Sequence, residues 1–316
     1  MVALGTAKYT YDVLENWGKL PDGYSYKECA AVGVDSNDNV YVFNRGEHPV
    51  IVFDREGNFL RSWGEGTYPR AHGITMAPGD TIFLTDDGDH TVRKCTLDGK
   101  ELFKLGISGT PAPFMSGNPF NRCTHVALDP DTGEFYVSDG YGNARVHKYT
   151  PEGKLLFSWG DSGTGEGQFN IAHNIATDKN GWVYVADREN QRIQVFDKTG
   201  KFETQWKDMA RPCGLFIDPM GDQTVYVGEL GVAIGPNSKA NGLGPRITIM
   251  DVAGNTLAKL GDVPEGEEPG TFIAPHGVCA DSRGDIYVAE VSWTHTGSNL
   301  TPPREVRSLQ KLMRKG

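Results

Sequence analysis

Three histidines occur at a regular spacing and could together bind a metal ion. His72, His173 and His276 are separated by 101 and 103 residues, and each begins a short, largely apolar segment: HGITMA, HNIATD and HGVCAD. Three neutral imidazoles leave one coordination position open, which is the ligand set of a catalytic zinc site rather than of a closed structural one. Nitrogen ligands alone do not choose among zinc, iron, manganese and copper. A lone histidine in such a place is more often a hydrogen-bonded structural residue, so the hypothesis depends on the fold.

Two arginines and a tyrosine could assist a metal at the same site. Arg45 and Arg188 directly follow β-branched, aromatic segments that read as strands, and Tyr141 stands between two glycines, two residues beyond Asp139. A tyrosine hydroxyl has an unperturbed pKa near 10. A neighbouring cation and a metal favour the phenolate and make it usable as a base. In the segment ADRENQR, by contrast, Asp187, Asn190 and Arg192 are expected to tie one structural unit to the next.

The elements that must position these residues form six copies of one unit. A dipeptide that closes an aromatic-rich strand recurs as Trp17-Gly18, Trp63-Gly64, Leu105-Gly106, Trp159-Gly160, Trp206-Lys207 and Leu260-Gly261. Each dipeptide is followed by three further strand-like segments, for example HNIATD, WVYVAD and RIQVFD. Four strands recurring at roughly 40 to 60 residues are typical of a β-propeller blade.

The two ends of the chain complete one blade between them. KYTYDVLENWG (8–18) is a fourth strand without its first three, and VRSLQKLM (306–313) is a third strand without its fourth. Pairing these segments closes the ring and removes exposed sheet edges. The sequence therefore predicts an all-β protein with one domain, 1–316, folded as a six-bladed β-propeller. Glycine-rich or polar insertions at 231–244 and 292–303 are expected to be surface loops.

The repeat alignment gives the histidines a common position. Five residues before the end of each first strand stand, in order, Ala30, His72, Thr124, His173, Cys213 and His276. The first strands of a propeller line its central channel, and alternate blades of six are about 120° apart. Histidines from blades two, four and six are therefore expected to converge as a tripod.

Composition excludes several classes of partner. The formal net charge of −10 argues against nucleic acid, whose phosphates need a basic surface. No apolar run approaches a membrane span, and the first residues lack the pattern of a secretory signal, so a cytoplasmic protein is expected, although a trimmed exported chain would look the same. Five widely spaced cysteines without a CxxC pair favour neither a disulfide framework nor a thiolate zinc site.

Nearly the whole chain resembles the peptidyl-α-hydroxyglycine α-amidating lyase family. The resemblance rests on NRGEH (44–48), SDGYGNARV (138–146), ADRENQRIQVF (186–196) and the AH or PH pairs at 72, 173 and 276. It implies a propeller with NHL-type repeats and a zinc held by His72, His173 and His276. It further implies Tyr141 as base and Arg45 and Arg188 in the pocket, for cleavage of a carbinolamide into an amide and glyoxylate.

The chain also departs from that family. Gly277 stands where an aspartate helps to hold a structural calcium, so calcium is not carried over, whereas zinc or another divalent transition metal is. His125 and Glu290 are secondary candidates for substrate contact. We expect a metal-dependent lyase for a small hydroxy-carboxylate substrate. A lactonase-like hydrolase or hydratase, and a non-catalytic NHL interaction module, remain the alternatives; the oligomeric state is not indicated.

Overall fold

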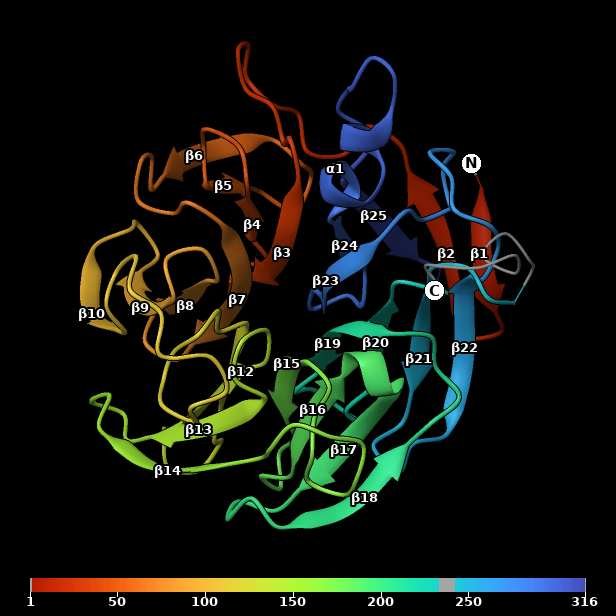
Figure 1. Ribbon diagram of the computed structural model, residues 1–316. Helices are drawn as coiled ribbons and strands as arrows, with labels where there is room; N and C mark the ends of the chain where they lie inside the picture. The colour runs from red at the N-terminus through yellow and green to blue at the C-terminus, as the bar shows by residue number, and fades with distance from the viewer. Residues whose placement is uncertain (1, 233–241, 316) are drawn as a thin grey trace. The chain divides into compact units, whose positions relative to one another are not determined.

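Antiparallel four-stranded sheets make up most of the chain, which the computed structural model describes over residues 2–232 and 242–315. These residues form five such sheets and one five-stranded sheet, which are the blades of a six-bladed β-propeller, as the sequence predicts (Figure 1). The chain separates into two compact units, one of residues 68–212 and the other of residues 1–67 with 213–316. That all of it acts as a single domain stays a prediction.

Residues 68–212 contain blades two, three and four. Their strands are β7 (Ala71–Ala77), β8 (Thr81–Asp86), β9 (Thr91–Thr96), β10 (Glu101–Leu105), β11 (His125–Leu128), β12 (Phe135–Asp139), β13 (Arg145–Tyr149), β14 (Leu155–Trp159), β15 (Ala172–Thr177), β16 (Val183–Asp187), β17 (Arg192–Phe196) and β18 (Phe202–Trp206). The first strands β7 and β15 both contact β11. Residues that begin β7 and β15 can therefore approach each other across the third blade.

The other unit contains blades one, five and six. Its strands are β3 (Cys29–Val34), β4 (Val40–Asn44), β5 (Val50–Phe53), β6 (Phe59–Trp63), β19 (Pro212–Ile217), β20 (Val225–Glu229), β21 (Arg246–Met250), β22 (Thr256–Gly261), β23 (Pro275–Ala280), β24 (Ile286–Glu290), β25 (Leu309–Arg314), β1 (Ala3–Thr6) and β2 (Tyr9–Leu14). The insertion at 292–303 carries the short helices α1 (Ser292–His295) and η2 (Gly297–Asn299). The insertion at 231–244 lies mostly outside the described residues.

The second strands are the best buried because side chains on both of their faces are covered. Every residue of β4, β8, β12 and β16 is buried, which explains their continuous apolar runs. The aspartate after a first strand shapes the turn into the second. In blade four, Asp178 accepts hydrogen bonds from the backbone amides of Asn180 and Trp182, both at 2.9 Å.

The N-terminal strand completes the C-terminal blade, as predicted. β2 pairs with β25 in a sheet ordered β1-β2-β25-β24-β23. Two details differ from the expectation. β1, which the sequence pattern did not indicate, adds a fifth strand through a tight turn at Ala7. β2 ends at Leu14, three residues before Trp17, because Asn16 adopts a positive φ; the Trp17 ring instead packs against Phe53 and Tyr287.

Among the described residues, no helix is both long and apolar enough to cross a membrane.

Candidate metal centre

Each of the three histidines stands at a β-bulge where its blade begins. In blade two the strand pairing steps from Ala71 to Gly73, so that His72 is the extra residue opposite β8. His173 and His276 occupy the same place in blades four and six, because the pairing likewise steps past each of them. A bulge turns a side chain away from the regular alternation of a strand. This local geometry presents all three imidazoles in the same way.

In residues 68–212, two of these histidines meet around a tyrosine. The ring centroids of His72 and His173 are 4.9 Å apart, and both side chains are buried. The hydroxyl oxygen of Tyr141 lies 3.2 Å from Nε2 of His72 and 3.1 Å from Nε2 of His173. Nδ1 of His72 lies 2.8 Å from the carbonyl oxygen of Thr124. Because a carbonyl only accepts, Nδ1 of His72 carries the proton, and Nε2 is the nitrogen suited to a metal.

Glycines on both sides of Tyr141 allow its loop to approach the histidine strands. A Cβ atom on Gly140 would lie 2.1 Å from the carbonyl oxygen of Ala172, the residue before His173. A Cβ atom on Gly142 would lie 2.2 Å from the side chain of Asn121. Any larger residue at either position would therefore push Tyr141 away from the imidazoles.

Arg188 contacts the tyrosine hydroxyl; that it takes part in the chemistry stays a prediction. Its Nη1 donates to the Tyr141 oxygen at 3.3 Å, and its Nε donates to Glu189 at 2.8 Å. Glu189 also accepts from Arg211 at 2.9 Å. Burial opposes ionisation of Glu189, but the two guanidinium groups outweigh it and lower the pKa of this carboxyl. Glu189 therefore fixes Arg188 in position while remaining charged.

The other unit holds the third histidine and the second predicted arginine. His276 is buried, and its Nδ1 lies 2.6 Å from the carbonyl oxygen of Ala30. In His276, as in His72, it is therefore Nδ1 that lies against a backbone carbonyl oxygen. Arg45 forms an ion pair with Glu28 at 2.6 Å, and Glu28 in turn accepts a hydrogen bond from the Thr294 hydroxyl at 2.8 Å. The structure thus gives Arg45 a carboxylate partner that the sequence pattern did not indicate.

The two secondary candidates have backbone contacts. Nδ1 of His125 lies 3.2 Å from the carbonyl oxygen of Ile175, and burial lowers the pKa of this histidine to about 4. Glu290 is completely buried and accepts hydrogen bonds from the amides of Ile273 and Ala274 at 2.6 and 3.1 Å. That either residue contacts a substrate stays a prediction.

The polar turn of blade four has the structural role that was expected. Asp187 accepts hydrogen bonds from Arg192 at 2.7 Å and from Asn190 at 2.8 Å. Asn190 also donates to the carbonyl oxygen of Gly163, in the loop that leads from blade three to blade four, at 2.8 Å. These side chains connect neighbouring blades.

A charged cluster beside Tyr141 was missed from the sequence. Buried Asp87 pairs with both Arg70 and Arg122 through its Oδ2. The Arg122 guanidinium lies 4.5 Å from the centroid of the Tyr141 ring, closer than that of Arg188 at 5.3 Å. A signal was present: Arg70 and Arg122 both stand two residues before the aligned position that His72 and Thr124 occupy in their blades.

The donor set fits a divalent transition metal. His72, His173 and His276 are all buried, and each offers one ring nitrogen as a ligand. Neutral imidazoles whose other nitrogen is fixed by a carbonyl are typical ligands of zinc and related ions. Their nitrogen chemistry does not suit calcium, which prefers oxygen ligands.

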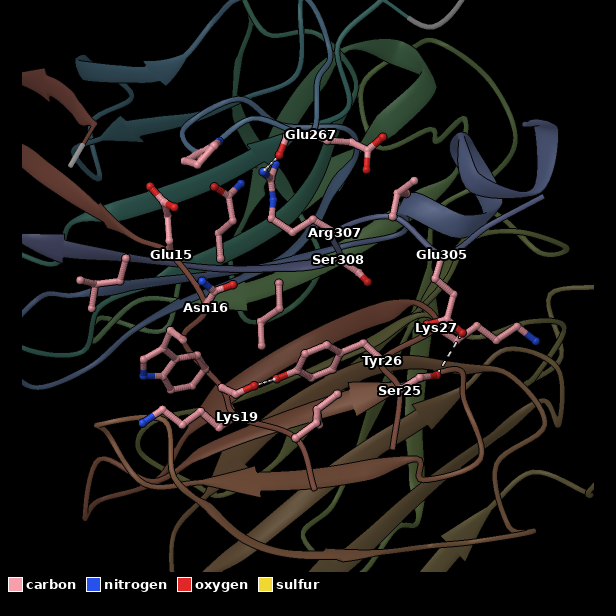
Figure 2. A pocket seen from close by; sticks show the side chains of 18 of the residues that line it. Glu15, Asn16, Lys19, Ser25, Tyr26, Lys27, Glu267, Glu305, Arg307 and Ser308 are labelled. Atoms are coloured by element: carbon pink, nitrogen blue, oxygen red, sulfur yellow. Dashed lines mark hydrogen bonds between the residues drawn. The ribbon is translucent and has the colours of Figure 1, made fainter. Parts of the chain in front are cut away.

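A separate pocket lies within the unit of residues 1–67 and 213–316. Its volume is about 670 Å³. Figure 2 shows Tyr26, Lys27, Glu305, Arg307 and Ser308 around it, and Ser25 donates a hydrogen bond to Glu305 at 3.0 Å. The residues that line this pocket include none of the side chains proposed for metal or substrate. Its mixed charges do not point to one kind of ligand.

Comparison with solved structures places the fold among propellers of diverse function. Virginiamycin B lyase from Staphylococcus aureus superimposes with a TM-score of 0.58 over 96% of this chain and 98% of its own, at 13% identity. A gluconolactonase from Xanthomonas campestris gives a TM-score of 0.61 over 92% of this chain and 88% of its own, at 12% identity. At such low identity these likenesses show the fold alone.

Sequence comparison is more specific. Peptidyl-α-hydroxyglycine α-amidating lyase 1 from Drosophila melanogaster is 31% identical over 75% of this chain and 45% of that protein. The NHL repeat model matches residues 169–196 and 272–296. NHL repeat-containing protein 3 from Homo sapiens is 36% identical over 92% of this chain and 84% of that protein. The chain therefore belongs to the NHL repeat family, with homology to the amidating lyases.

Proposed function

We propose that this protein is a metal-dependent lyase that cleaves a small carbinolamide bearing a carboxylate, N–CH(OH)–COO⁻, into an amide and glyoxylate. The observation that carries the proposal is the contact of the Tyr141 hydroxyl with three groups: Nε2 of His72, Nε2 of His173 and the guanidinium of Arg188. The hydroxyl of a potential base thus contacts two nitrogens that can bind a metal and one cationic side chain. The homology to amidating lyases supports the same reaction.

We assign His72, His173 and His276 as the metal ligands. They share one place in the repeat, all are buried, and each offers a ring nitrogen. A zinc or similar divalent ion bound there supplies Lewis-acid polarisation of the substrate hydroxyl. The carbonyl oxygens of Thr124 and Ala30 hold the rings of His72 and His276 in the orientation that such binding needs.

The side chains of the protein perform the proton transfers. Tyr141 accepts the hydroxyl proton of the carbinolamide as the C–N bond breaks and the C=O bond of glyoxylate forms. The same proton then passes to the departing amide nitrogen, so the tyrosine is regenerated. Arg188, which donates to the Tyr141 oxygen, stabilises the phenolate that accepts the first proton and that forms again after the second transfer. No water is consumed.

Turnover of N-benzoyl-α-hydroxyglycine tests this proposal. The protein of residues 1–316, supplied with zinc, should release benzamide and glyoxylate faster than the uncatalysed reaction in the same buffer. His173→Ala should lose bound metal and turnover while keeping its circular dichroism spectrum, because the blade cores lie elsewhere. Mass spectrometry of the products identifies the bond that breaks.

Other products would identify the alternatives. Hydrolysis of a lactone with oxygen-18 from the solvent in the carboxylate, without cleavage of the carbinolamide, would make the protein a hydrolase. A folded protein that retains no stoichiometric transition metal would instead fit an interaction module.

A further inference from the structure

We propose that Arg70 and Arg122, held together by Asp87, bind the carboxylate of the substrate. This inference rests on the function proposed above, because it names the group that recognises the anionic end of the carbinolamide. The family resemblance implies Arg45 and Arg188 as the pocket arginines; the carboxylate site proposed here is made of different residues.

The cluster places two cations on one anion. Arg122 donates to Oδ2 of Asp87 through Nη2 at 2.6 Å and through Nε at 3.1 Å, and Arg70 donates to the same oxygen through Nη1. Arg45, by comparison, is paired with the carboxylate of Glu28, whereas Glu189 is likewise shared by two arginines, Arg188 and Arg211. Two guanidinium groups facing a single carboxylate leave positive charge for a second anion.

Donors also remain for that anion. Among the described residues, none accepts a hydrogen bond from Nη1 of Arg122 or from Nη2 and Nε of Arg70. The side chains of Arg70 and Arg122 are 35% and 41% exposed, although Asp87 beneath them is fully buried. A guanidinium whose far edge is open can bind a carboxylate through two parallel hydrogen bonds.

Asp87 itself indicates that the cluster is incomplete. Its second oxygen, Oδ1, is buried and receives no hydrogen bond from the described residues. A buried acceptor is rarely left without a donor, so a further polar group belongs at this place.

The cluster lies beside the assigned base. The Arg122 guanidinium is 4.5 Å from the centroid of the Tyr141 ring. A carboxylate bound by Arg122 would keep the neighbouring carbon, which carries the hydroxyl, close to the tyrosine. Arg70 and Arg122 are thus proposed as specificity-determining residues, with proton transfer left to Tyr141.

Binding of two unreactive analogues tests the assignment without turnover. N-benzoylglycine carries the carboxylate, and N-benzoylglycinamide is its neutral counterpart. Calorimetry on the zinc-loaded protein of residues 1–316 should show tighter binding of the carboxylate analogue than of the amide. Arg122→Gln should weaken N-benzoylglycine binding about 10- to 100-fold, the usual range for a lost charged hydrogen bond, and leave the amide within about threefold. Arg122→Lys should recover part of the preference, because it keeps the charge without the paired donors.

Three further variants complete the test. Arg70→Gln examines the same cluster if Arg122→Gln fails to fold, and Arg304→Gln removes a surface arginine that is paired with Glu267 as a matched control. Equal binding of the two analogues by the unaltered protein would overturn the proposal. So would a preference that survives in Arg122→Gln and Arg70→Gln but disappears in Arg45→Gln. If the preference depends on Arg122 but no carbinolamide is cleaved, the carboxylate site stands and the proposed reaction falls.

Discussion

At the scale of single residues, the site depends on hydrogen bonds that select one ring nitrogen for each task. The carbonyl of Thr124 engages Nδ1 of His72, and the carbonyl of Ala30 engages Nδ1 of His276. Tyr141 then contacts Nε2 of His72 and His173. The proposed metal binding and the proposed proton transfer thus use neighbouring atoms, and substitutions can separate the two.

Tyr141→Phe should separate them. The variant removes the hydroxyl and keeps the ring, so we expect the bound zinc to stay stoichiometric while kcat falls about 100-fold or more, the usual contribution of a positioned base. Metal analysis and steady-state kinetics measure the two effects. Tyr24→Phe is the control, because that hydroxyl contacts Ser62 away from the site. Undiminished kcat in Tyr141→Phe would remove the tyrosine as base.

His125 should make stability depend on pH. Burial lowers its pKa to about 4 in the folded protein, below the usual value near 6.5 of the unfolded chain. Between those values only the unfolded chain binds the proton, so this residue destabilises the folded state as the pH falls from about 6.5 towards 4. The loss should be roughly 1–3 kcal/mol. His125→Gln should lessen it.

Urea unfolding of both proteins at pH 7.5 and pH 4.5 measures the effect. Asp86 has the opposite effect on stability. Burial raises the pKa of its carboxyl to about 6, so its protonation favours the folded state as the pH falls. Its contribution is the same in both proteins and cancels in the comparison. If the free energy of unfolding depended equally on pH in the two proteins, the lowered pKa of His125 would be contradicted.

At the scale of strands and turns, the features that could be predicted from the sequence are those that recur from blade to blade. The six blades, the pairing of the terminal strands and the common phase of His72, His173 and His276 follow from a period that is repeated several times. Features that occur once were missed: β1, the early end of β2 before Trp17, and the partner of Arg45. Glu28 and Arg45 meet because they extend the β3–β4 hairpin by one pair beyond Cys29 and Asn44, a register that was not predicted.

The turn after β16 should contribute strongly to the stability of blade four. Buried Asp187 is the shared acceptor of Arg192 and Asn190. Asp187→Ala leaves the Arg192 charge buried without its partner, so we expect a loss of about 3–5 kcal/mol in the free energy of unfolding. Urea denaturation followed by circular dichroism measures the loss.

Asp197 offers a matched control in the same blade. It accepts hydrogen bonds from the amides of Thr199 and Lys201, in the turn between β17 and β18. Because that turn is closer to solvent, Asp197→Ala should cost only about 1 kcal/mol. If the two variants lost similar amounts of unfolding free energy, the hydrogen bonds of Asp187 would contribute no more to stability than those of an ordinary turn.

At the scale of the whole molecule, the first and last segments of the described chain depend on each other. β2 pairs with β25 and brings Tyr9, Tyr11 and Val13 into a core cluster with Leu312 and Phe272. Burying three such side chains contributes on the order of 5–8 kcal/mol. This is comparable to the total stability of a typical domain, about 5–15 kcal/mol. The unit of residues 1–67 and 213–316 should therefore not survive the loss of β2.

Deletion of residues 1–16 tests this dependence, with buried cysteines as reporters. Burial raises the thiol pKa of Cys29 and Cys279 in this unit and of Cys95 and Cys123 in residues 68–212. In the intact chain all four should resist a pulse of iodoacetamide at pH 8, because the thiolate is the reactive form. In the shortened chain Cys29 and Cys279 should become alkylated first, since their unit has lost its closing strand. Peptide mapping locates the label, and a synthetic peptide of residues 1–16 should restore protection. A shortened chain in which Cys29 and Cys279 stay protected would mean that β25 and its neighbours hold together without β2.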